Sequence, residues 1–237
     1  MITVDNILTY DINWRNSIYD EIFNKKEYEY NNILVEEDDI VADLGANIGI
    51  FSLYAESKKA KKIYAFEPIK DYALLFEKNL KNYSNVLLFK SAISYRTGEG
   101  EILYNFQDNT ILKDVYNKFN WKEEEINQRV KINLISINDF MINIEKIDFL
   151  KIDIEGSEYD ILESITPENL NKIRKIACEY HWNYDNRLEF SINKLKENDF
   201  IVFHFVINKI REIGKLFAIK KEVFTTNSGK ININYFL

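Results

Sequence analysis

The stretch from Ile40 to Phe51, which reads IVADLGANIGIF, constrains the fold of this chain more than any other. Its first residues are short and apolar, as in a strand that is buried on both faces of a parallel sheet. The chain then turns from Gly45 to Gly49 and enters a segment with the apolar pattern of a helix. The sequence therefore predicts a strand, a tight turn of small residues and a helix, which is the repeating unit of α/β sheets.

This turn suits a ligand that carries two opposite charges. Small residues let backbone N–H groups approach a ligand closely, and the helix N-terminus favours an anionic group. Asp43 at the strand end adds a carboxylate, which repels phosphate but suits an ammonium group. The methionine part of S-adenosylmethionine carries both charges, so this molecule is the predicted cofactor. Its predicted contacts here are Asp43, Gly45, Ala46, Asn47 and Gly49.

A dinucleotide-binding turn is the rival interpretation of the same residues. The G-x-G-x-x-G pattern read from Gly45 needs glycine at two positions that Asn47 and Ile50 occupy. The spacing D-x-G-x-x-x-G therefore favours a methyltransferase loop over a nicotinamide-dependent dehydrogenase. Asn47 can replace a glycine because asparagine adopts left-handed backbone conformations more readily than most residues. A glycine turn that binds no ligand is the remaining alternative.

The next two strands add predicted cofactor contacts. A buried strand ends at Glu67-Pro68, and Glu67 lies about 20 residues beyond the glycine turn, where an acid accepts the ribose hydroxyls in nucleotide-binding units. Pro68 ends that strand because it cannot donate a ladder hydrogen bond. A third strand, Val86 to Phe89, leads into Ser91 and Ala92. Their small side chains leave room for a flat ring, so we expect the adenine there.

Composition limits the class of protein. The 237 residues are 46% hydrophobic and 14% aromatic, which predicts one folded α/β domain over residues 1–237. The net charge of −7 disfavours broad contact with a nucleic-acid backbone. A single cysteine, Cys178, excludes an internal disulfide and suits a reducing compartment. The sequence shows neither a signal-peptide pattern nor a membrane span, so we expect a cytoplasmic protein.

Two segments flank this pattern without carrying a motif. We expect residues 1–38 to form an N-terminal cap, a helix laid against the main sheet, and a substrate lid is the alternative. Residues 101–135 interrupt the alternation of strands and helices, with strands expected at Glu101 to Phe106 and Val130 to Ile135. This insertion is predicted to be solvated, and a wall of the acceptor pocket is the alternative. His204, inside an apolar run, is predicted to be a core residue.

Residues 148–158, which read DFLKIDIEGSE, predict a second functional strand end. Strand parity puts Lys151 and Asp153 on one face, where the lysine would neutralise a carboxylate. A later strand delivers Glu179 and His181, which also share a face. Ligands of open α/β sheets bind beyond the carboxyl ends of the strands. The acids and the histidine at these ends are Asp43, Glu67, Asp153, Glu179 and His181.

Four motifs in this order and spacing resemble the FkbM family. They read VADLGANIG (41–49), AFEP (65–68), LKIDIEGSE (150–158) and EYH (179–181), within a resemblance that covers roughly residues 35–185. The resemblance implies a class I, Rossmann-like methyltransferase that uses S-adenosylmethionine, often on hydroxyl oxygens of sugars or secondary metabolites. It also implies helices on both faces of a mostly parallel seven-stranded sheet. The implied strand order is 3-2-1-4-5-7-6, with strand 7 antiparallel.

The group expected to activate the acceptor is Asp153, Glu158, Glu179 and His181. His181 can be the general base, since its ordinary pKa suits neutral pH, with Asp153 or Glu179 orienting the ring or holding the cofactor's ammonium group. Asp153, Glu179 and His181 can instead bind a divalent metal that lowers the pKa of the acceptor hydroxyl. In a third interpretation, Glu179 and His181 only hydrogen-bond a loop.

The predicted function is therefore O-methylation of a sugar, glycolipid precursor or secondary metabolite. Because a fold alone does not establish chemistry, a non-catalytic nucleotide-binding or interaction module on the same fold is a second hypothesis. A methyltransferase that acts on RNA or protein is a third. The expected partner is a small-molecule or carbohydrate acceptor.

Overall fold

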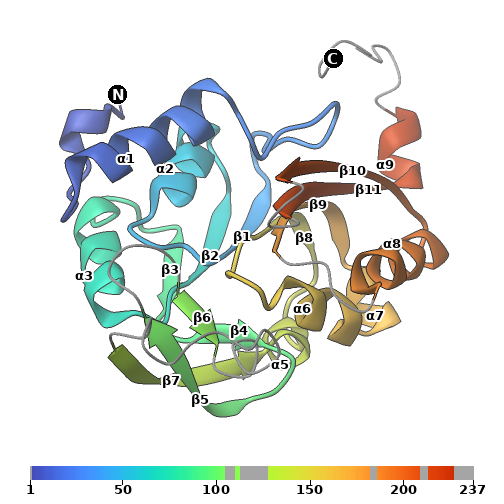
Figure 1. Cartoon of the computed structure of the whole chain (residues 1–237). Helices are drawn as coiled ribbons and strands as arrows, with labels where there is room; N and C mark the ends of the chain where they lie inside the picture. Colours follow the sequence, from blue (N-terminus) through green and yellow to red (C-terminus); the bar gives the residue numbers. More distant parts are fainter. Residues whose placement is uncertain (1, 105–109, 113–127, 182–185, 209–212, 227–237) are drawn as a thin grey trace.

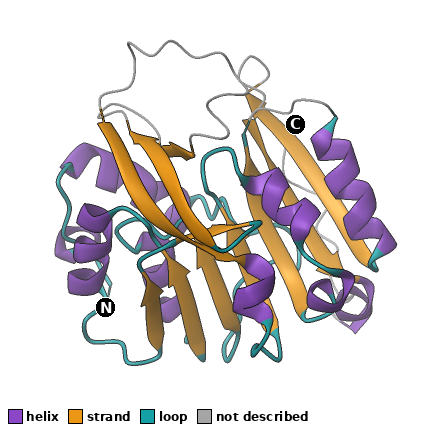
Figure 2. Cartoon of the chain, turned by 90° about the horizontal axis from the view of Figure 1, so that it is seen from below, coloured by secondary structure: helices purple, strands orange, loops and turns teal. Residues whose placement is uncertain are grey.

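The computed structural model describes residues 2–104, 110–112, 128–181, 186–208 and 213–226, which form two sheets with flanking helices (Figures 1 and 2). The larger sheet has seven strands in the order β3-β2-β1-β8-β9-β11-β10. In that order the strands are Val86–Phe89, Lys62–Phe66, Ile40–Leu44, Ile147–Ile152, Ile173–Tyr180, Ile213–Lys220 and Phe200–Asn208.

The topology of this sheet confirms the predicted fold class. β1 pairs in parallel with both β2 and β8, and β9 pairs in parallel with β8. β11 pairs antiparallel with both β9 and β10, so among the seven described strands it is the one whose direction is opposite to the others. This is the order 3-2-1-4-5-7-6 with an antiparallel strand 7. Because β3, β2, β1, β8 and β9 are parallel, their carboxyl ends meet at one edge of the sheet.

Helices cover both faces of the larger sheet, and an apolar core lies on each face (Figure 1). On one face α1, η2, α2, α3 and α9 pack with the apolar core of which Phe51 and Phe76 are part. On the other face α5, α6, α7 and α8 pack with the core that contains Tyr159 and Leu195. The helices are α1 Ile12–Tyr19, η2 Asp20–Asn24, α2 Ile50–Ser57, α3 Lys70–Asn79, α5 Ile137–Met141, α6 Glu158–Ser164, α7 Pro167–Leu170, α8 Arg187–Glu197 and α9 Lys221–Thr226, with a short η1 at Val4–Asn6.

A second sheet of four strands, in the order β4-β7-β5-β6, contains the described part of the predicted insertion. The strands expected around that segment are present as β5 (Gly98–Tyr104) and β7 (Gln128–Ser136), which pair antiparallel. β4 (Ala92–Ser94) and β6 (Thr110–Leu112) complete the sheet. Its apolar side packs beside α3 through Ile69, Ile102, Ile132 and Leu134. Most of the segment between β5 and β7 lies outside the described residues.

The N-terminal residues lie beside α2, on the face of the sheet that α3 also covers (Figure 1). Lys175 of β9 fixes the end of this segment, since its fully buried ammonium group lies 2.7 Å from Glu36 and 2.9 Å from Asp39.

No helix in the described part of the chain is long and apolar enough to cross a membrane.

The prediction that His204 is a core residue is wrong. His204 is exposed, as are the last residues of the same strand, Val206 to Asn208. β10 is the outermost strand at its end of the sheet, so part of its apolar run has no covering layer. An apolar run indicates a strand, but only the strand order shows whether that strand is buried.

Candidate active site

A cavity of about 730 Å³ opens above the carboxyl ends of β1, β2 and β8. One wall comes from the N-terminal segment through Tyr10, Trp14 and Tyr28. The floor and the far walls come from the ends of strands that are distant in sequence. Of the predicted site residues, those that line the cavity are Gly45, Ala46, Asn47, Glu67, Pro68, Ala92, Asp153 and Glu179.

The glycine turn has the backbone that its sequence predicts. Asn47 has φ of 49°, which confirms the left-handed conformation expected of an asparagine in place of glycine. Gly45 has φ of 80°, and a Cβ atom there would lie 1.8 Å from the carbonyl oxygen of Asp153. Only glycine therefore lets the turn pass this close to the end of β8.

The amide groups of this turn have partners within the protein. The N–H groups of Gly45 and Ala46 donate to the carbonyl oxygen of Phe66 at 3.1 Å and 2.9 Å. The N–H of Asn47 donates to Glu67 at 2.9 Å. The turn is thus tied to the end of β2, which holds its shape ready for a ligand.

Gly49 and Ser91 do not line the cavity, although the sequence predicts both as cofactor contacts. A Cβ atom on Gly49 would lie 2.3 Å from Leu80 and 2.9 Å from Phe76, so this glycine is needed for packing of α2 against the end of α3. Ser91 is buried, and its neighbour Ala92 faces the cavity instead.

Glu67 is buried at the cavity wall, with 4% of its surface exposed. Its Oε1 accepts the N–H of Ile69 at 2.7 Å, and its Oε2 accepts the N–H of Asn47 at 2.9 Å. Burial raises the pKa of Glu67 to about 7 despite these two hydrogen bonds. Each carboxylate oxygen keeps a second lone pair, so the group can still accept two hydroxyls of a ribose.

Asp43 lies beneath the cavity and does not line it. Its fully buried carboxylate accepts the hydroxyl of Ser52 at 2.8 Å and lies 3.2 Å from the ammonium group of Lys151. The predicted neutralisation of a carboxylate by Lys151 is therefore confirmed. Because Asp43 is fully buried and does not line the cavity, its predicted contact with the cofactor's ammonium group does not fit this geometry.

Asp153, unlike Asp43, lines the cavity. Its Oδ2 accepts the hydroxyl of Tyr28 at 2.8 Å and lies 3.6 Å from Lys151. Burial alone would raise the pKa of Asp153, but the charges of Lys151, His181 and Lys215 lower it overall. A charged carboxylate therefore faces the cavity beside the glycine turn.

His181 is buried among several carboxylates and does not line the cavity. Its Nδ1 donates to Glu158 at 3.0 Å, and its Nε2 lies 3.5 Å from Glu155 and 3.7 Å from Glu179. Burial lowers the pKa of His181, but Glu158, Glu155 and Asp153 together raise it to about 10. At neutral pH the ring is an imidazolium, which has no lone pair with which to accept a proton.

Glu158 is a structural partner of His181 in this arrangement. Its buried carboxylate also accepts the N–H groups of Ile154 at 3.2 Å and Gly156 at 2.9 Å, which fixes the turn before α6. Like His181, Glu158 is not part of the cavity lining. The four residues of the predicted catalytic group lie close together, but only Asp153 and Glu179 line the cavity. Glu158 and His181 lie behind them.

Glu155 is a cavity residue that the sequence analysis did not single out. Its Oε2 is buried and accepts no hydrogen bond among the described residues. Burial raises its pKa to about 8. One ligand atom each from Asp153, Glu155 and His181 lie within 4.8 Å of one another, so these three could hold a metal ion. Glu179 of the predicted metal set pairs instead with Lys215.

Known proteins match this chain over most of its length. The FkbM methyltransferase domain matches residues 43–216. The antimetabolite synthetase AmbE of Pseudomonas aeruginosa is 28% identical over 72% of this chain, which spans only 10% of that protein. The 31-O-demethyl-FK506 methyltransferase FkbM of Streptomyces tacrolimicus is 22% identical, over 69% of this chain and 74% of that protein. The hexuronic acid methyltransferase AglP of Haloferax volcanii is 24% identical, over 70% of this chain and 71% of that protein.

The matched region contains the glycine turn, Glu67 and the strand ends at Asp153 and Glu179, whereas the N-terminal wall of the cavity lies before it. The chain therefore belongs to the FkbM family of S-adenosylmethionine-dependent methyltransferases.

Proposed function

We propose that this chain transfers the methyl group of S-adenosylmethionine to a hydroxyl oxygen of a sugar or a small metabolite. One observation carries the proposal. A single cavity joins an apolar end, the buried acid Glu67 and a group of carboxylates at the ends of adjacent strands. Such a cavity can hold a nucleoside and an acceptor side by side.

The cavity lining suggests how the cofactor lies. Ala92, Ile93 and Ile102 form an apolar end that suits the adenine ring. Glu67, which lines the cavity, would accept the ribose hydroxyls. The ammonium group of the methionine part would lie at Asp153, beside Gly45, because this is the charged carboxylate that reaches the cavity next to the turn.

The acceptor would lie next to the acids of β8 and β9. Methyl transfer is an in-line displacement at a sulfonium carbon, so holding the acceptor oxygen in line is a large part of catalysis. We propose Glu155 as the group that takes the hydroxyl proton, because its side chain lines the cavity just beyond the end of β8. Since burial raises its pKa to about 8, the ionised form that accepts a proton predominates only above about pH 8, and transfer should increase with pH up to that range. His181, held by Glu158, would then be a positioning residue. Its positive charge would stabilise the ionised form of Glu155.

The acceptor class rests on the relatives and on the N-terminal wall. The names of the two relatives give 31-O-demethyl-FK506 as the acceptor of FkbM and hexuronic acid as that of AglP. Tyr10 and Trp14 at the cavity offer aromatic faces on which an apolar metabolite or the apolar face of a sugar can pack. The net charge of −7 disfavours RNA as the acceptor.

The proposal is tested by a methyl-transfer screen with labelled cofactor. Sugars, glycolipid precursors, small metabolites, RNA and protein serve as acceptors, and Glu155→Gln is compared with the wild type. We expect transfer to a hydroxylated small molecule and loss of transfer in Glu155→Gln, with cofactor binding retained. Transfer only to RNA or protein would contradict the acceptor class. Failure to bind S-adenosylmethionine or S-adenosylhomocysteine would contradict the function itself.

A chelation arm separates the base from a metal. If a metal at Asp153, Glu155 and His181 activates the acceptor, exhaustive chelation abolishes transfer and magnesium or manganese restores it. If Glu155 acts as the base without a metal, transfer survives chelation.

A further inference from the structure

We propose that Tyr28, which lies before the region matched by the family, is a positioning residue of the cofactor site. It holds the Asp153 carboxylate in the orientation that receives the ammonium group of S-adenosylmethionine. This inference rests on the proposed function, and it adds to the cofactor site a residue from the N-terminal segment.

The contacts of Tyr28 hold both its ring and its hydroxyl in a fixed position at the cavity. The side chain is 7% exposed and lines the cavity. Its hydroxyl donates to Asp153 Oδ2 at 2.8 Å. The ring packs edge-on against Phe51, with ring centres 5.4 Å apart, and its face lies 4.1 Å from the ammonium group of Lys215. Phe51 and Lys215 therefore fix the ring, and the ring fixes the direction of the hydroxyl.

A neutral donor at this position has a particular effect on the carboxylate. The hydrogen bond favours the ionised form of Asp153 without cancelling its charge, as a second lysine would. Tyr28 and Lys151 both approach Oδ2. The other oxygen, Oδ1, is then the one available to a ligand's ammonium group.

The same segment also connects to the acceptor side of the cavity. Glu27 lies 3.5 Å from Lys215, and Lys215 pairs with Glu179 at the end of β9. Consecutive residues of the N-terminal segment thus reach Asp153 and, through Lys215, Glu179. These contacts place the segment in the cofactor site itself, which goes beyond a covering layer on the sheet.

The test compares two ligands and two variants by calorimetric titration. S-adenosylhomocysteine carries the ammonium group, whereas 5′-methylthioadenosine keeps the adenine and ribose but lacks the amino-acid part. Tyr28→Phe removes only the hydroxyl and leaves the ring against Phe51. Tyr54→Phe is the matched control, since Tyr54 also donates to a partly buried acid, Glu29, and neither residue lines the cavity.

We expect Tyr28→Phe to weaken S-adenosylhomocysteine binding about tenfold and to leave methylthioadenosine binding within about twofold of the wild type. Tyr54→Phe should leave both affinities within about twofold. In an Asp153→Asn background, Tyr28→Phe should have no further effect, because the carboxylate that it positions is gone.

Unchanged S-adenosylhomocysteine binding in Tyr28→Phe would overturn the inference. Equal losses for both ligands would also overturn it, since they would show a structural role only. If Tyr28→Phe does not fold, Asp153→Asn alone decides: it must weaken S-adenosylhomocysteine selectively for the inference to stand. A wild type that binds neither ligand overturns the proposed function and this inference together, whereas binding by the wild type with an unaltered variant overturns this inference alone.

Discussion

Glu67→Gln is the substitution whose effect on cofactor binding can best be worked from the structure. Glu67 uses both carboxylate oxygens to accept backbone N–H groups, from Ile69 and Asn47, and offers the remaining lone pairs to the ribose. Glutamine keeps one acceptor oxygen but places an NH₂ group where the other oxygen was. That NH₂ group faces a backbone donor and cannot accept a ribose hydroxyl.

The expected loss of affinity follows from these two changes. A hydrogen bond to a charged group contributes about 1.5–3 kcal/mol, and a neutral one about 0.5–1.5 kcal/mol. One ribose contact is lost, and the other is weakened by about 1 kcal/mol, so the sum is roughly 2.5–4 kcal/mol. At about 1.4 kcal/mol for each factor of ten, the Kd should rise between about 60-fold and 700-fold.

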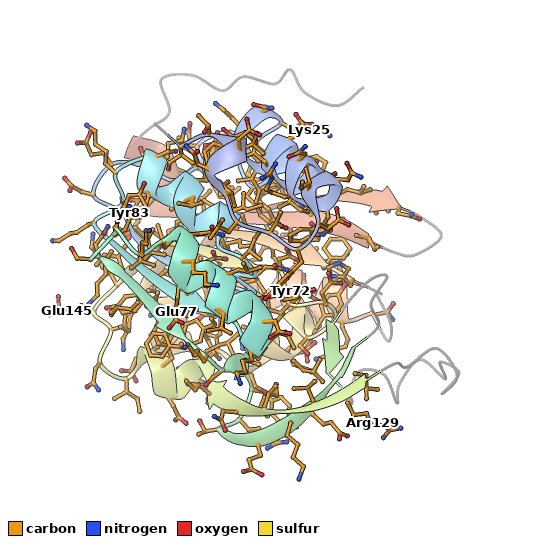
Figure 3. The ribbon with its side chains drawn as sticks, turned by 90° about the vertical axis from the view of Figure 1, so that its left-hand side faces the viewer. Lys25, Tyr72, Glu77, Tyr83, Arg129 and Glu145 are labelled. Atoms are coloured by element: carbon orange, nitrogen blue, oxygen red, sulfur yellow. The ribbon has the colours of Figure 1, made fainter. Side chains whose placement is uncertain are left out.

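The assay is calorimetric titration of S-adenosylhomocysteine at about pH 8, where Glu67 is mostly ionised because its pKa is raised to about 7. Glu77→Gln is the control, since Glu77 lies on α3 (Figure 3) and pairs with Lys90 at 2.7 Å. Glu77 does not line the cavity. The control should leave the Kd unchanged. A Kd of Glu67→Gln within about threefold of the wild type would refute the ribose contact and the placement of the cofactor built on it.

Three further predictions follow from other features. Because the ribose hydroxyls donate to ionised Glu67, whose pKa is raised to about 7, the Kd of S-adenosylhomocysteine should rise about tenfold per pH unit below about pH 7 in the wild type and stay flat in Glu67→Gln. Gly45→Ala should lower the unfolding temperature and abolish detectable cofactor binding in thermal-shift assays, because its Cβ would lie 1.8 Å from the Asp153 carbonyl oxygen; normal binding would mean that the turn relaxes. Lys175→Met should lower the free energy of unfolding in urea by about 3–5 kcal/mol by leaving buried Asp39 without its cation, and a loss below about 1 kcal/mol would contradict that reasoning.

The sequence by itself determined the fold and the cofactor edge of the sheet. Apolar strands, small-residue turns and acids at strand ends are local patterns, and parallel strands bring their carboxyl ends to one edge whatever the details of packing. Three features could therefore be predicted: the left-handed backbone of Asn47, the position of Glu67 at the cavity and the pairing of Lys151 with a carboxylate. Each of them depends on one turn or on neighbouring strands.

Only the tertiary structure decided which of these side chains reach the cavity. Asp43 is covered by Ser52 and Lys151, and His181 is enclosed by the acids around it, so neither faces the space that the sequence assigned to it. Tyr28 reaches Asp153 from 125 positions away, and no periodicity encodes a contact between such distant segments. Strand patterns fix which edge of the sheet carries the chemistry, whereas the exposure of each group depends on the packing of segments that are remote in sequence.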